Sequence, residues 1–177
     1  MDQMNRHLYE SLIPALRETE VTVCMENLFT RNDRQEMEGA CSNPYEACAL
    51  IDEMNDKAGK VCFGMCVDTG HLNILGKNQK NFICAMGPRV KALHLHDNWG
   101  DDDNHLAPYT GNILWQDVME GLVDIGYDRN INFETYRQVL LSRIDEETAP
   151  IWLRTIHDIG AVFARKVEAG RKKSQHR

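Results

Sequence analysis

Apolar residues along the chain follow two alternating kinds of pattern. In five segments they recur three or four positions apart, which is the spacing of an amphipathic helix. Asn43 followed by Pro44 is typical of a helix start, Gly59 is typical of a helix end, and Gly87-Pro88 would stop a shorter helix. We therefore predict helices over residues 5–18, 43–59, 77–86, 113–127 and 145–169.

Four short runs rich in apolar residues lie between these helices. Each run is nearly continuous in apolar residues instead of alternating strictly with polar ones. Strands of this kind, separated by helices, are typical of a parallel sheet that is buried on both faces. The pattern predicts an α/β fold with strands over residues 21–29, 61–68, 91–97 and 130–136.

Each predicted strand carries a carboxylate or an imidazole at or near its carboxyl end. Parallel strands place their carboxyl ends at one edge of a sheet, which is where α/β enzymes have their active sites. An acid at one such position is explained equally well as a helix cap or an ion-pair partner. Its recurrence at four equivalent positions favours a shared site, formed by Glu26, Asp68, the segment from His94 to Asp97, and Glu134.

Three carboxylates and an imidazole brought together would repel one another unless a cation held them. Oxygen-rich ligation with one imidazole suits Mn²⁺, Mg²⁺, Co²⁺ or Zn²⁺. The set contains no thiolate, which argues against a structural zinc site. The sequence therefore predicts one bound divalent metal at the carboxyl edge of the sheet.

Five motifs carry a family resemblance through their order and placement. Together they resemble the second half of the xylose isomerase-like TIM barrels, a superfamily of sugar and sugar-phosphate isomerases and epimerases that also includes the apurinic endonucleases. The likeness covers nearly the whole chain and implies a parallel (β/α) TIM-barrel type of fold. The motifs are CMENLF, VDTGHLN, ALHLHDN, DNHLAPYTGNILW and NFETY.

The resemblance assigns roles to individual residues. It implies that His71 contacts the substrate beside the metal, and that Asp103 and His105 correspond to a pair that binds a further metal in the endonucleases. In HLHD either histidine could be the ligand, because strand alternation places both on one face. The family pattern favours the first, and His96 is expected either to support the site by hydrogen bonding or to take part in a second metal site with Asp103 and His105. The implied ligands are Glu26, Asp68, His94 and Glu134, with Mn²⁺ as the first choice of metal.

The implied reaction is isomerisation or epimerisation of a ketose or sugar phosphate through an enediolate. Glu26 and Glu134 would remove and return the proton, while His71 would orient a hydroxyl group. Trp99 is a candidate wall for the sugar, with core packing as its alternative. Arg137 is a candidate for a phosphate or carboxylate, with a surface ion pair as its alternative.

Charge and composition narrow the class of protein. The net charge of −7 disfavours nucleic acid and anionic membranes as general partners. No apolar run approaches the ~18 residues of a membrane helix, and the N-terminus lacks a signal-peptide core, so a cytoplasmic location is expected. The six cysteines show no disulfide or zinc spacing. The basic tail, residues 166–177, is expected to be a frayed terminus.

The chain is short for a complete barrel, which has eight strand-helix units and ~250 residues. About four units are expected here, in a half-barrel over residues 1–165. Open sheet edges favour association, either with a second copy or with a missing N-terminal half. Two alternatives to the sugar enzyme remain: a metal-dependent apurinic endonuclease-like phosphodiesterase, and a non-catalytic half-barrel that needs a partner.

Overall fold

The centre of the fold is a parallel sheet of three strands. The computed structural model describes residues 3–32, 35–140 and 144–175. Strands β1 (Val23–Glu26), β4 (Phe63–Asp68) and β5 (Val90–His94) lie in the order β1-β4-β5, and both pairs are parallel. A parallel bridge from Leu95 to Phe133 adds the beginning of a fourth strand. The expected α/β class is confirmed, and the sheet is open, as in part of a barrel.

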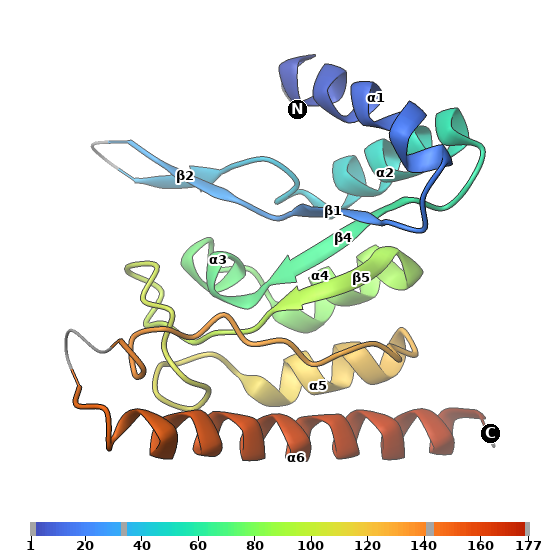
Figure 1. The fold of residues 1–177 in the computed structure, drawn as a ribbon. Coiled ribbons are helices and arrows are strands. Elements are labelled where there is room, and N and C mark those ends of the chain that lie inside the picture. Colours follow the sequence, from blue (N-terminus) through green and yellow to red (C-terminus); the bar gives the residue numbers. More distant parts are fainter. Residues whose placement is uncertain (1–2, 33–34, 141–143, 176–177) are drawn as a thin grey trace.

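Helices form an outer layer around this sheet (Figure 1). Every residue of β4 is buried, because this strand has a neighbour on each side and helices behind it. The outward-facing side chains of the strands, such as Met25, Met65 and Leu93, share one hydrophobic core with the helices. The helices are α1 (Gln3–Arg17), α2 (Pro44–Ala58), α4 (Gln79–Met86), α5 (Trp115–Asp124) and α6 (Ala149–Gln175).

The ends of α2 confirm the predicted signals. The Asn43 side chain accepts hydrogen bonds from the backbone N–H groups of Tyr45 and Glu46, so it satisfies two of the donors that a helix start leaves free. Gly59 ends the helix in the left-handed conformation, with φ of 72°. Both ends of α2 therefore lie where the sequence predicts them.

Two local elements were missed from the sequence. A short helix, α3 (Thr69–Ile74), follows β4 directly, with the Asp68 side chain as its cap. The segment after β1 forms an antiparallel hairpin of β2 (Phe29–Arg31) and β3 (Glu36–Glu38), which projects beyond the carboxyl ends of the parallel strands (Figure 1). Both elements are too short to show a recognisable period in the sequence.

Two sequence predictions need correction. The fourth strand, predicted over residues 130–136, pairs with the sheet only near Phe133, through hydrogen bonds from Leu95 N to Asn132 O (3.0 Å) and from Glu134 N to Leu95 O (3.0 Å). The basic tail is helical as far as Gln175, because Val167 is buried in the core and continues the packed face of α6. Residues 176–177 lie outside the described part. Among described residues, no helix is long and apolar enough to cross a membrane.

Candidate functional site

The four residues predicted as metal ligands lie together at the carboxyl edge of the sheet. Glu26 ends β1, Asp68 ends β4, His94 ends β5, and Glu134 follows the bridge at Phe133. Each offers one ligand atom, and these four atoms lie within 4.8 Å of one another. His94 Nδ1 is 3.4 Å from Glu26 Oε2 and 3.1 Å from Glu134 Oε2. The folded chain therefore concentrates three carboxylates around one imidazole.

Asp68 is the most firmly held member of this group. It is fully buried, and the Asn27 side chain forms two hydrogen bonds with its backbone. Asn27 Nδ2 donates to Asp68 O (2.9 Å), and Asp68 N donates to Asn27 Oδ1 (2.8 Å). Asp68 Oδ1 also accepts from the His71 backbone N–H (2.8 Å). Asp68 therefore both caps α3 and faces the four-residue group, so the two interpretations of this residue, as a helix cap and as part of a shared site, are compatible.

His71 bridges the four-residue group and a second group of side chains. Its Nδ1 lies 3.0 Å from Asn27 O and 3.2 Å from Glu26 Oε1, and its Nε2 lies 3.5 Å from Asp103 Oδ2. Burial alone would lower the pKa of His71, but hydrogen bonds to Asp103 and Glu26 and the charge of Asp68 raise it to about 10. In the absence of a cation a pKa of about 10 corresponds to an imidazolium, which carries an N–H on each nitrogen.

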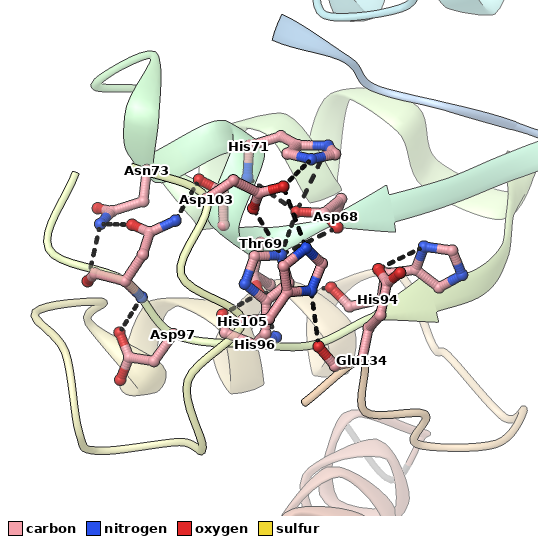
Figure 2. A network of polar contacts seen from close by, with 12 residues as sticks. Asp68, Thr69, His71, Asn73, His94, His96, Asp97, Asp103, His105 and Glu134 are labelled. Carbon is pink, nitrogen blue, oxygen red and sulfur yellow. Dashed lines mark hydrogen bonds and ion pairs between the residues drawn. The ribbon is translucent and has the colours of Figure 1, made fainter. Parts of the chain in front are cut away.

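Asp103 is the centre of the second group (Figure 2). Its Oδ2 lies 3.0 Å from His105 Nε2, and its Oδ1 lies 3.7 Å from His96 Nε2. With His71, three imidazoles therefore direct Nε2 towards one carboxylate. Burial would raise the pKa of Asp103, but the hydrogen bond from His71 and the nearby imidazoles lower it to about 2. The predicted pair Asp103 and His105 thus lies beside the four-residue group.

His94 and His96 have different surroundings in the structure. His96 is fully buried, and its Nε2 lies 3.0 Å from Asp68 Oδ1 and 3.2 Å from Asp68 Oδ2. Its ring stacks on His105 with centroids 4.2 Å apart. Burial lowers and the Asp68 carboxylate raises the pKa of His96, with a net upward shift. His96 therefore contacts the Asp68 carboxylate directly, whereas His94 belongs to the four-residue group. Two further groups of possible ligands contain His96, namely Asp68, His71 and His96, and His96, His105 and Glu134. The choice of His94 as the ligand stays a prediction.

Asp97 organises the loop that carries Asp103 and His105. Its carboxylate is fully buried. Each oxygen accepts two N–H groups, and this saturates the side chain, so we assign it no place in a metal site. The donors are Asn98 N (3.0 Å), Tyr109 N (2.9 Å), Ile113 N (3.1 Å) and Trp115 Nε1 (3.0 Å).

The structure does not join the two remaining candidates to the cluster. Trp99 is 57% exposed, and within the described residues its hydrogen bond is from Asn112 Nδ2 to its backbone oxygen (3.0 Å). Arg137 has a buried Nε without a hydrogen-bond partner in the described part of the chain. Their substrate roles stay predictions.

Sequence reasoning missed three residues around the site. Asn27 fixes Asp68, as described above. Phe29 packs on His71 with ring centroids 5.2 Å apart, and Tyr136 packs on His105 at 4.8 Å. Each lies within three residues of a predicted ligand, Glu26 or Glu134, and this proximity was the signal in the sequence that could have identified them.

The donor set fits a divalent cation. Three carboxylates and an imidazole match the preference of Mn²⁺ and similar ions for oxygen-rich ligation. Two buried atoms, His94 Nδ1 and Asp103 Oδ1, have no hydrogen-bond partner among the described residues, so both are available to a ligand that replaces their ion-pair contacts. The excess of carboxylate charge at the edge would also fall on binding a cation.

Comparisons with known proteins identify the family and the fold. The family described as xylose isomerase-like TIM barrel matches residues 3–156. D-psicose 3-epimerase of Enterocloster bolteae is 32% identical over 82 residues, which is 46% of this chain and 24% of that protein. An uncharacterized protein of Methanocaldococcus jannaschii is 40% identical over 94 residues, 51% of this chain and 30% of that one.

Solved structures show the same fold. A D-tagatose 3-epimerase-like protein superposes with a TM-score of 0.60 at 23% identity, covering 89% of this chain and 54% of that chain. D-psicose 3-epimerase in the presence of D-fructose gives a TM-score of 0.65 at 15% identity, covering 90% and 55%. At these identities the likeness concerns the fold. The chain spans about half the length of these structures and less than a third of the curated relatives above.

Proposed function

This chain belongs to the xylose isomerase-like TIM barrel family, and from that premise we propose that it provides the divalent-metal site of an isomerase or epimerase acting on a ketose or sugar phosphate. The observation that supports the proposal is the convergence of Glu26, Asp68, His94 and Glu134 within 4.8 Å. The 3-epimerases among the solved structures of the same fold support a ketose as the substrate class.

The proposed ligands are the four residues of that group, with Mn²⁺ as the first choice of metal. A bound divalent cation would polarise the carbonyl and a neighbouring hydroxyl of an open-chain ketose and so acidify a carbon-bound hydrogen. Glu26 and Glu134 come from different elements, and each has an oxygen within 3.4 Å of His94 Nδ1. Two carboxylates placed in this way can take a proton from carbon and return it from another direction.

His71 is proposed to bind a substrate hydroxyl. Its ring is held by Asn27 O on one side and by the ring of Phe29, so that Nε2 faces Asp103 and the cluster. A hydroxyl that replaced the long 3.5 Å contact with Asp103 would find a charged donor in His71 and an acceptor in Asp103. The pair can therefore orient a hydroxyl and stabilise negative charge that develops on it.

The open sheet is proposed to be completed by association, with a second copy or with an N-terminal half. A groove of about 430 Å³ runs beside the incomplete fourth strand, and Phe133 lies on Gly160 of α6 at its wall. Among the described residues this strand pairs with the sheet on one side, at Leu95, and a further strand could add on its other side. The lining residues are Asn130, Ile131, Asn132, Phe133, His157, Gly160, Ala161 and Ala164.

A second candidate is a metal-dependent phosphodiesterase related to the apurinic endonucleases. The observation that favours it is the position of Asp103 among three imidazoles, which could hold a further cation beside the first. The net charge of −7 weighs against binding of a nucleic acid. Measurable cleavage of a duplex that contains an abasic site, without exchange of sugar protons, would favour this candidate over the sugar enzyme.

Deuterium exchange tests the sugar reaction directly. The chain is incubated with Mn²⁺ and D-psicose or D-fructose in D₂O, and the recovered sugar is examined for carbon-bound deuterium by mass spectrometry. Proton transfer predicts incorporation by the parent and its loss in Glu134→Gln, whereas the exposed Glu146→Gln control behaves like the parent. No incorporation in a metal-loaded, folded parent would show that this chain alone does not perform the chemistry, which is the prediction of the non-catalytic half-barrel.

A further inference from the structure

Arg31 joins two segments at the rim of the site that are far apart in the sequence. It lies in β2 of the projecting hairpin, and its guanidinium reaches the loop between β5 and α5. Arg31 Nη2 donates to Asp101 O (3.1 Å), and Nη1 donates to Asp102 Oδ1 (3.4 Å). A third donor, Nε, bonds Glu36 Oε1 (3.0 Å) across the hairpin, so the guanidinium is itself held in place.

The loop is fixed firmly at its base. Asp97 N donates to Leu106 O (2.8 Å), and Leu106 N donates to Asp97 O (2.9 Å), so an antiparallel bridge closes the loop. Near this base the Asn98 side chain is also held, by Asn73 Nδ2 (2.7 Å). Asp101 and Asp102 lie at the tip and are exposed. Within the described residues, Arg31 supplies the hydrogen bonds that reach Asp101 and Asp102 from another element.

Asp103, the next residue, turns back from the tip into the cluster. It is partly buried and contacts the Nε2 atoms of His71 (3.5 Å), His96 (3.7 Å) and His105 (3.0 Å). Two of these contacts are longer than ordinary hydrogen bonds, so a small displacement of the tip would change them. The peptide between Asp102 and Asp103 therefore links the contacts of Arg31 to the geometry of the imidazoles.

We propose that Arg31 is a positioning residue, which acts through Asp101 and Asp102 to hold Asp103 against the three imidazoles. It thereby strengthens cation binding at the neighbouring four-residue group. The cation part of this inference rests on the proposed function. Arg31 suits the role because its planar fork binds three acceptors at once, in directions that a lysine ammonium cannot reproduce together. The hairpin thus becomes a support for the site.

A role in global stability would leave a different signature. The side chains of Arg31 and Asp102 are 44% and 54% exposed, and ion pairs at such positions contribute little to folding. Replacing Arg31 should therefore leave the unfolding transition nearly unchanged while it loosens the loop tip. Lys77→Ala is a matched control, because Lys77 also ties the hairpin to the body of the protein, through Glu38 (2.6 Å), without contact to the tip.

The test compares the parent with Arg31→Ala, Arg31→Lys and Lys77→Ala in two measurements. Hydrogen exchange of peptides covering residues 98–106, recorded without metal, should be faster in Arg31→Ala by about three- to tenfold, intermediate in Arg31→Lys, and unchanged in Lys77→Ala. Titration with Co²⁺, followed by its visible absorption, should show weaker binding by a similar factor and an altered band in Arg31→Ala.

Each outcome has a defined meaning. Unchanged exchange of the tip in Arg31→Ala would overturn the inference, and so would faster exchange with Co²⁺ affinity and absorption equal to those of the parent. A parent that binds no Co²⁺ would contradict the proposed function instead. In that case the metal-free exchange measurement still decides whether Arg31 holds the tip.

Discussion

The side-chain amide of Asn27 pairs with the backbone of Asp68 through two hydrogen bonds, one in each direction. Asn27 directly follows Glu26 at the end of β1, and Asp68 ends β4. The bonds of 2.9 and 2.8 Å fix the two strand ends relative to each other at the point where both carboxylates enter the cluster. The spacing of Glu26 and Asp68 is thereby set by a neutral residue.

Replacing Asn27 by alanine should therefore weaken both the fold and the site. Asn27 is fully buried, so Asn27→Ala would leave an N–H and a C=O group of Asp68 without their partners. We expect a loss of about 2–4 kcal/mol in the free energy of unfolding, measured with urea. The exposed Asn81→Ala serves as the control. An Asn27→Ala variant as stable as the parent would show that these bonds do not hold the strand ends.

Gly70 should tolerate no side chain as long as His96 keeps its position. A Cβ at Gly70 would lie 1.9 Å from His96 Cε1. Gly70→Ala must therefore displace the His96 ring from Asp68, and we expect a loss of about 1–3 kcal/mol in the free energy of unfolding. The double variant Gly70→Ala/His96→Ala removes the clash. In a double-mutant cycle the double variant should lose less free energy of unfolding than the sum of the two single losses. Simple additivity of the two losses would contradict this packing.

The stability of the cation-free protein should fall between neutral and alkaline pH because of His71. Its pKa is raised from 6.5 to about 10 in the folded state, so the protonated side chain stabilises the fold fully below pH 6.5. This contribution is lost as the pH rises through about 10. The difference in free energy of unfolding between the parent and His71→Gln should therefore shrink over this range. A difference independent of pH would contradict the assigned imidazolium.

The sequence predicted those parts of the site that depend on strand ends. Glu26, Asp68, His94 and Glu134 could be identified because each ends an apolar run, and parallel pairing brings such ends together. The local cap of α2 at Asn43 was readable for a similar reason, since it requires only neighbouring residues.

Contacts between distant segments were not readable in the same way. Arg31 and Asp102 are 71 residues apart and meet only through the projecting hairpin, whose strands of three residues carry no clear alternation. The stacking of His96 on His105 depends on the path of a loop that Asp97 organises from within. The fourth predicted strand also has the composition of a strand. Among the described residues, however, it pairs with the sheet through a single bridge, from Leu95 to Phe133.

Glu26, Asp68, His94 and Glu134 are proposed to bind one divalent cation. Elemental analysis after loading with Mn²⁺ and removal of free metal tests this proposal most directly, in the parent, Glu134→Gln and the exposed control Glu146→Gln. We expect about one cation per chain in the parent and in the control, and a large loss in Glu134→Gln, because a ligand is removed. A folded parent without metal, or a Glu134→Gln variant that retains as much as the parent, would contradict it.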